Sequence, residues 1–448
     1  MESSAAQCAE DDEVAPLLDT CRARYRSVIE SVQDGFLDRV QSEGWPPDGV
    51  LRQTQIFDRF VDPHAQAQEK VAYFLVDSMR YEMGCDLVSA LASLGEVSLA
   101  PAAAVLPTCT AFGMAALMPG ADGALTLATK DGNAIPALGD TPLPDCASRI
   151  SLLRARYGTR LFETPLHKVM SVSAKTLAGR IGGADVVVVR SSADDLPENL
   201  SLYQARKYMS DALADLRKAA GWFAKMGFRY QVFAADHGHV LLPEIPAGDV
   251  IGAPDGKWAL SKRRCRLGHS LSASQGVVIL KARSVGIVGD QPELCVPTGF
   301  KTFERGEGYF HEGVSLQECV IPVVKLVVSA ERRDQEKQEI RLKYKSDVFT
   351  SHIIGLKVSF ISMFTESVRV RIEAYDGEDA KAKKVGEAVD CDARDETTRE
   401  ILLKKDETAQ VPVQIDRDFR GENVEIRAIA PDTGLVWARL KLDNRVMD

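Results

Sequence analysis

The sequence predicts an α/β fold in its larger N-terminal part and a separate β-rich region after it. Three observations favour this interpretation. Apolar runs typical of strands alternate with amphipathic segments typical of helices. The run Val186–Val189 is apolar at every position, as expected for a strand buried on both faces of a parallel sheet. Beyond Glu331 the chain changes to short alternating runs separated by Gly, Asp and Asn.

The first predicted element is a helical lead-in. Apolar residues recur at helical spacing over residues 15–60, with a break at GWPPDG. A strand is then predicted at Val71–Val76, followed by a polar turn and an amphipathic helix over about Arg80–Leu94. A second strand region runs through EVSLAPAAAVLPT, and a helical segment follows at Ala111–Leu117.

Two later strands have a long helix between them. The strands are predicted at Val186–Val189 and Val232–Ala235, and the helix at Tyr203–Met226. The repeated unit is therefore strand, turn, helix, which is typical of α/β proteins.

The C-terminal region begins with a charged segment, Glu331–Lys345, whose alternating signs indicate a linker or a solvated strand face. The short runs that follow predict a β-sandwich of about seven strands. We therefore expect a helical segment over residues 1–65, an α/β domain over 66–330 and a β-sandwich over 331–448.

Composition narrows the functional classes. The chain has 448 residues, a net charge of -9 and an ordinary globular balance of 45% hydrophobic and 27% charged residues. Its charge argues against coating nucleic acid through the overall field, although a local basic patch could hold phosphates. Nine dispersed cysteines without a CxxC pair indicate free thiols in a reducing compartment. With no secretory signal and no apolar stretch of about 20 residues, we expect a cytoplasmic protein without membrane contacts.

Polar residues follow the predicted strands, at the positions where α/β proteins bind ligands. Asp77 ends the first strand, and the stretch FRYQVFAADHGHVLLPE ends another strand on Asp236 and His237. The alternatives are a helix cap for Asp77 and a simple turn for the Asp-His-Gly sequence.

Further candidates occur in LPTCTAFGMAAL and GYFHEGVSLQECVIPVV. Thr108 and Thr110 precede a helix start, and a threonine hydroxyl there could attack phosphorus if a metal lowered its pKa. We assign this role to Thr108 and expect Thr110 to cap the helix. His311 follows a strand end, with a structural imidazole as the alternative. Together these carboxylate, hydroxyl and imidazole groups suit zinc or manganese.

Four segments in this order, VDSMRYE, LPTCTAFGMAALMPG, AADHGH and FHEGVSLQECVIPVV, resemble the PglZ domain of the alkaline phosphatase superfamily. The resemblance covers roughly residues 65–330. It implies an alkaline phosphatase-like α/β/α sandwich, and the β-rich region is similar to the tail that often follows that domain. Proteins of this family occur in BREX-type phage defence and as output domains of response regulators, so other defence-system proteins are implied partners.

The resemblance also implies roles for individual residues. One metal site would be formed by Asp77, Thr108, Asp236 and His237, with Thr108 as the nucleophile. A second site would include His311 and Asp194, but Glu198 or Asn199 stands where the family pattern has a histidine. The remaining ligand of that site would be Asp195, His239 or water.

A basic segment, SKRRCRLGHS, supplies candidate substrate-binding residues. Arg263 and Arg264 could clamp a phosphate in the forked geometry that arginine favours. The alternative is a solvated basic loop.

The function implied is a metal-dependent phosphodiesterase or nuclease that uses a divalent metal, zinc or manganese, and acts on nucleic acid or an oligonucleotide. The first alternative is a catalytically weakened scaffold of a BREX-type defence complex. The second is a phosphomonoesterase, because one fold can host several chemistries. The sequence contains no Walker loop and no GxGxxG motif after a strand, so nucleotide binding of those kinds is not supported.

Overall fold

In the computed structural model of the protein, the chain forms two compact units, Met1–Ser329 and Ala330–Asp448. The described residues are 15–191, 202–242, 245–306, 308–329, 339–361, 367–377, 382–395, 398–405, 407–431 and 434–446.

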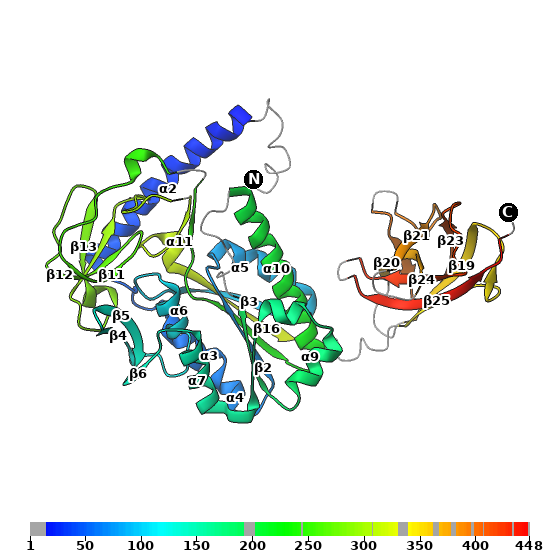
Figure 1. Ribbon diagram of the computed structural model, residues 1–448, viewed down its shortest axis with the longest axis horizontal. Helices are drawn as coiled ribbons and strands as arrows, with labels where there is room; N and C mark the ends of the chain where they lie inside the picture. The colour runs from blue at the N-terminus through cyan, green and yellow to red at the C-terminus, as the bar shows by residue number, and fades with distance from the viewer. Residues whose placement is uncertain are drawn as a thin grey trace. The chain divides into compact units, whose positions relative to one another are not determined.

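A seven-stranded sheet forms the centre of the first unit, in the order β1-β3-β16-β9-β2-β8-β7. Its strands β3, β16 and β2 are labelled in Figure 1. Strand β2 pairs in parallel with both β8 and β9, whereas β16 runs antiparallel between β3 and β9. All six residues of β2 are buried, so the sheet is covered on both faces at its centre. The strands are β1 (Leu51–Arg52), β2 (Val71–Val76), β3 (Gly95–Ala103), β7 (Leu161–Pro165), β8 (Val186–Ser191), β9 (Tyr230–Ala235) and β16 (Val320–Val328).

Helices cover both faces of this sheet (Figure 1). Phe74 of β2 packs against Phe223 of α10, with ring centroids 5.8 Å apart. The preceding residue, Tyr73, packs against Phe57 of α3 at 5.5 Å. Because successive strand residues point to opposite faces, α10 and α3 lie on opposite sides of the sheet. The predicted α/β/α sandwich is therefore confirmed.

One face carries α5 (Tyr81–Leu91) and α10 (Leu202–Lys225), and the other carries α3 (Ile56–Phe60), α6 (Thr110–Ala116) and α7 (Cys146–Tyr157). Three further short helices complete the layers: α4 (Asp62–Gln66), α8 (Leu166–Met170) and α9 (Ala174–Ile181). The predicted helix over Arg80–Leu94 is observed as α5 and a following 3-10 turn, Ala92–Leu94.

Smaller sheets flank the large one. A four-stranded sheet in the order β11-β12-β14-β13 shares an apolar core with Leu37 and Val40 of the long N-terminal helix α2 (Ala15–Glu43). Its strands are β11 (Lys257–Ser261), β12 (Arg266–His269), β13 (Val277–Lys281) and β14 (Glu293–Pro297). The others are β4 (Leu125–Lys130), β5 (Asn133–Leu138) and β6 (Thr141–Pro142) in one sheet, and β10 (Val240–Leu241) with β15 (Tyr309–Phe310).

The helical lead-in departs from the expectation at one point. Leu51–Arg52, inside the segment expected to be helical, forms strand β1 at the edge of the large sheet. The two residues pair with Ala102 and Ala103 of β3, a contact between segments about fifty residues apart that local periodicity does not reveal.

The second unit contains strands and, within its described residues, no helix. Its sheet follows the order β17-β19-β23-β21-β20-β24-β25-β18, with β22 paired to β20. Strands β17 and β25 are in contact, so the sheet folds over one apolar core, as expected of a β-sandwich. The strands are β17 (Glu339–Lys343), β18 (Val348–Phe349), β19 (Ile353–Ile361), β20 (Ser367–Asp376), β21 (Lys383–Ala388), β22 (Ile401–Lys404), β23 (Thr408–Ile415), β24 (Asn423–Ile429) and β25 (Val436–Asn444).

Among the described residues, no helix combines the length and the apolar character needed to cross a membrane.

Candidate metal centre

Asp77 and Asp236 lie side by side at the carboxyl edge of the large sheet. Strands β2 and β9 are parallel neighbours with Val76 opposite Ala235, so the next residues, Asp77 and Asp236, lie next to each other. The ladder continues past the strand ends, because the Asp236 N–H donates to Val76 O at 3.4 Å. The two carboxylates and His237 form a group whose potential ligand atoms all lie within 4.8 Å of one another.

The Asp236 carboxylate is fixed by the backbone. Its Oδ1 accepts hydrogen bonds from the N–H groups of Ser78 and His237, each at 2.8 Å. Its Oδ2 is buried and has no hydrogen-bond partner among the described residues. Burial raises the pKa of Asp236 to about 7, although these two N–H donors act in the opposite direction. A buried carboxylate oxygen without a partner is costly, and a metal ion would satisfy it.

His237 presents one ring nitrogen to the two acids. Its Nδ1 lies 2.9 Å from Gly238 O, and since a carbonyl can only accept, Nδ1 carries the proton and Nε2 is left as an acceptor. Nε2 lies 3.4 Å from Asp236 Oδ2 and 4.0 Å from Asp77 Oδ1. Burial lowers the pKa of His237, which favours the neutral imidazole that metals bind.

Thr110, and not Thr108, completes this group. The Thr110 hydroxyl lies 3.2 Å from His237 Nε2. Thr108 is buried, and its hydroxyl donates to Gly313 O at 2.9 Å. The assignment of Thr108 as nucleophile and ligand is therefore wrong on geometry. Thr110 is also not a helix cap, because it is the first residue of α6 and Cys109 occupies the cap position.

The helix that carries Thr110 approaches the acid strand closely. A Cβ atom placed on Gly113 of α6 would lie 2.2 Å from Asp236 O, so only glycine allows this contact. Gly238 has the same function on the other side of His237, since a Cβ there would lie 2.0 Å from Gln317 O. The glycine in AADHGH therefore lets the turn after β9 pack against the start of α11 (Leu316–Cys319).

His311 lies beside the group of ligands but is not one of its three members. Its ring stacks on that of His237, with centroids 4.2 Å apart and an interplanar angle of 18°. Nδ1 of His311 donates to Thr108 O at 3.1 Å, so its Nε2 is the acceptor. The pKa of His311 is lowered by burial and by the neighbouring His237, which favours the neutral form. These features suit a ligand of a second, adjacent metal.

His239, the predicted alternative ligand of the second site, makes contacts that differ from those of His237. Its Nδ1 donates to Ser78 O at 2.8 Å, and within the part of the chain that the structure describes its buried Nε2 has no hydrogen-bond partner. Asp194, the acid expected in the second site, and its neighbours Asp195, Glu198 and Asn199 lie outside the described residues.

The basic segment does not supply a free arginine pair. Arg264 is buried, with Nη2 at 3.4 Å from Glu318 Oε2 and Nη1 donating to Lys301 O at 2.7 Å. Its assignment to substrate binding is wrong, because the guanidinium is held inside the protein. Arg263 directs Nη1 to Tyr309 O at 3.2 Å and lies over the Phe310 ring, so the structure places it in a packing role as well.

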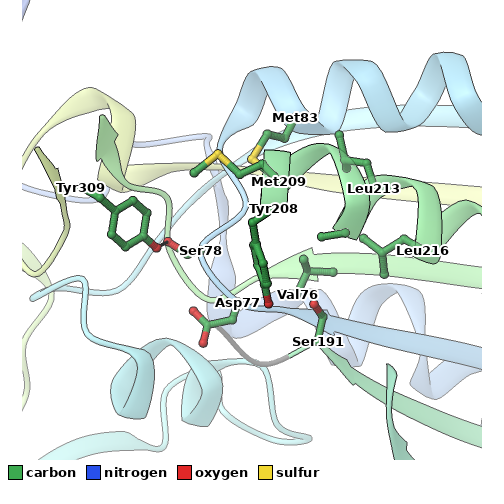
Figure 2. A pocket seen from close by; sticks show the side chains of 11 residues that line it. Val76, Asp77, Ser78, Met83, Ser191, Tyr208, Met209, Leu213, Leu216 and Tyr309 are labelled. Atoms are coloured by element: carbon green, nitrogen blue, oxygen red, sulfur yellow. Dashed lines mark hydrogen bonds between the residues drawn. The ribbon is translucent and has the colours of Figure 1, made fainter. Parts of the chain in front are cut away.

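Two cavities, one on each face of the large sheet, extend to its carboxyl edge beside Asp77. One is lined by Asp77, Tyr309 and residues of α10, and Figure 2 shows the Asp77 carboxylate below it, with the hydroxyl ends of Tyr208 and Tyr309 pointing toward the end of β2. The other is lined by Asp77, Thr110 and residues of α6 and α7. Val76 lines the first and Leu75 the second, so the cavities belong to opposite faces.

The donor set fits a divalent metal. Two carboxylates and a neutral imidazole, with the Thr110 hydroxyl next to them, are the ligand types found in zinc and manganese sites.

The chain is similar to known proteins over the region that contains this group of residues. The model of the BREX system PglZ alkaline phosphatase-like domain matches residues 56–326, which include all the ligands described above. A curated protein from Bacillus cereus (strain H3081.97), named "Alkaline phosphatase-like protein PglZ", is 23% identical over 336 residues. The alignment covers 72% of this chain and 38% of that protein, so the chain spans well under half of the relative's length.

The matched region extends from α3 to β16, and it comprises the whole sheet except the edge strand β1. This is the part of the molecule that brings the strand-end acids, His237 and the start of α6 together. The chain belongs to the family of the BREX system PglZ alkaline phosphatase-like domain.

Proposed function

We propose that the chain is a metal-dependent phosphodiesterase with Thr110 as its nucleophile. The observation that carries this proposal is the convergence of Asp77, Asp236 and His237 within 4.8 Å, with the Thr110 hydroxyl 3.2 Å from His237 Nε2. A hydroxyl next to a metal-ligand set at the carboxyl edge of a parallel sheet is the arrangement needed for nucleophilic attack on phosphorus.

In the proposed reaction the Thr110 oxygen forms a bond to phosphorus while the bond from phosphorus to the leaving alcohol breaks. The hydroxyl proton of Thr110 passes to solvent water, and the alcohol leaves with the electron pair and takes up a proton from water. A water molecule then hydrolyses the phosphothreonine and restores the hydroxyl group. When bound, the divalent metal would lower the pKa of the hydroxyl and offset negative charge on the phosphoryl group.

The two cavities favour a diester over a monoester. A phosphodiester carries a substituent on each side of phosphorus, and the cavities approach Asp77 from opposite faces of the sheet. We propose nucleic acid or an oligonucleotide as the substrate class, and zinc or manganese as the metal. We also propose that the protein works in a BREX-type defence system together with other defence proteins.

The test is hydrolysis of bis(p-nitrophenyl) phosphate and of p-nitrophenyl phosphate by the purified chain, with metal analysis and with a chelator control. We expect faster turnover of the diester and loss of turnover with chelator. Thr110→Ala should abolish turnover and Thr110→Ser should retain part of it.

The matched control is Thr108→Val, which removes a buried hydroxyl of the same type two residues away. It should lower the melting temperature, because Gly313 O loses a donor, but leave turnover per folded molecule intact. Loss of turnover in Thr108→Val but not in Thr110→Ala would overturn the assignment. Tight metal binding without hydrolysis of either ester would indicate the scaffold instead.

A further inference from the structure

An arginine of helix α7, Arg149, lines the same cavity as Thr110. Arg149 lines this cavity together with Asp77, Thr110 and Arg190. It comes from a segment that the sequence analysis did not assign to any element or role. Its positive charge therefore lies in the cavity beside the proposed nucleophile.

Within the described part of the chain, Arg149 makes one hydrogen bond, from Nη1 to Leu143 O at 3.5 Å, and no ion pair. Burial lowers the pKa of Arg149, and Asp236 is among the groups that counteract this effect. The Arg149 side chain is thus partly buried, and its charge interacts with a carboxylate of the proposed metal centre. Most arginines in such positions are paired, because an unpaired buried cation is costly.

The other cations around the centre have carboxylate partners. Arg190 binds Glu163, with Nε at 2.6 Å from Oε1. Lys262 pairs with Glu312 at 3.0 Å, and Arg264 pairs with Glu318 at 3.4 Å. Their charges are compensated by these carboxylates, whereas no carboxylate among the described residues pairs with Arg149, so its charge can serve an incoming anion.

The charges of the proposed centre also favour the binding of an anion by Arg149. Asp77 and Asp236 would together cancel the charge of one divalent ion, and burial keeps His237 neutral. A phosphoryl group entering beside Thr110 would then need a further cation. The cavity has a volume of about 50 Å³. At roughly 10–15 Å³ for each water-sized atom, it has room for the oxygens of one phosphate.

We propose that Arg149 binds the phosphoryl oxygens of the substrate, so that the anion subsite of this protein is built by α7 and not by the basic segment 261–270. The proposal rests on the proposed function for the identity of the substrate, but the subsite itself is defined by its affinity for a tetrahedral oxyanion. Arginine suits this role because its fork donates two parallel hydrogen bonds to two oxygens of one phosphate.

The experiment measures binding of inorganic phosphate to the full-length, zinc-loaded chain by isothermal titration calorimetry. Arg149→Met should weaken phosphate binding by about 10- to 100-fold, as expected for loss of charge-assisted hydrogen bonds. Arg149→Lys should recover part of the affinity, because it keeps the charge but not the fork. Arg154→Met is the control, since it removes an exposed arginine from the same helix and should leave binding unchanged.

Binding of phosphate by Arg149→Met with wild-type affinity would overturn the proposal, as would absence of phosphate binding by the wild type. If the wild type binds phosphate but hydrolyses no ester, the proposed function fails while the Arg149 subsite is still measured. If Arg149→Met does not fold, the test is chemical modification of wild-type Arg149 with phenylglyoxal, with and without phosphate. Phosphate should protect Arg149 from the reagent, and equal modification with and without phosphate would overturn the proposal.

Discussion

At the scale of single residues, Asp236 shows how the centre is prepared for a metal. One carboxylate oxygen is held by two backbone N–H groups, and the other is buried with no partner in the described ranges of the chain. Burial raises the pKa of this carboxyl from 3.8 to about 7. The metal-free fold therefore favours a protonated Asp236, whereas a metal requires the ionised form.

The sign of the resulting pH dependence follows from linkage. Because the pKa of Asp236 is higher in the folded state, its contribution to stability is fully present below about pH 4 and is lost as the pH rises through about 7. The buried histidines have lowered pKa values and act in the opposite direction, so the contribution of Asp236 must be isolated by comparison.

We predict that Asp236→Asn stabilises the metal-free protein relative to the wild type, and that this difference grows between pH 5 and pH 8. The amide cannot ionise, so the cost of burying a charge disappears. The measurement is calorimetric unfolding of both proteins in chelator across this range. A difference in melting temperature that stays constant with pH would show that Asp236 does not titrate there.

At the scale of elements, the position of Thr110 depends on how closely α6 approaches the end of β9. Gly113 lies one turn after Thr110 and meets Asp236 O at a distance that excludes any side chain. Gly113 has no left-handed backbone angle, so an alanine there would suffer only from this contact. The close approach keeps the hydroxyl and the carboxylate in one centre.

Gly113→Ala should therefore destabilise the protein by about 1–3 kcal/mol, as for other overpacked positions. It should also weaken metal binding, because α6 and Asp236 must move apart. The control is Gly179→Ala in α9, where a Cβ meets nothing within 4 Å. That variant should be stabilised by about 0.5–1 kcal/mol, since alanine favours helix. Urea unfolding measures the change in stability, and competition with a metal indicator measures the change in metal affinity. If Gly113→Ala and Gly179→Ala changed stability and metal affinity equally, the close contact between Gly113 and Asp236 would not be the cause.

At the scale of the whole molecule, the chain forms two units, and the described residues of the proposed centre all belong to the first. The first unit ends just after β16, a central strand of the large sheet that lies between β3 and β9. Each unit has an apolar core of its own.

We predict that a chain ending at Ser329 folds and binds metal with the stoichiometry of the full chain. A chain ending at Glu318 should not fold, because removing β16 would leave β3 and β9 without their shared partner. Circular dichroism and metal analysis distinguish the two outcomes. Loss of metal from the longer fragment, in spite of native secondary structure, would show that the second unit contributes to the centre.

The sequence by itself determined the layers of the fold and the acids of the centre. Apolar strands are recognisable because burial on both faces demands apolar residues at every position, and the candidate ligands Asp77, Asp236 and His237 directly follow such strands. The resemblance to the PglZ domain rested on the same segments. Residues that follow parallel strands can be predicted to lie close together, because the carboxyl ends of parallel strands lie at one edge of the sheet.

Only the tertiary structure decided which side chains face the centre. Thr108 and Thr110 share one short segment, and their hydroxyls point to Gly313 and His237 respectively because of contacts between residues more than 120 positions apart. Arg264 has the sequence context of a phosphate ligand but is buried by its pairing with Glu318, whereas Arg149 has no such context and lines the cavity. Side-chain direction in turns and loops is set by long-range packing, which local spacing does not encode.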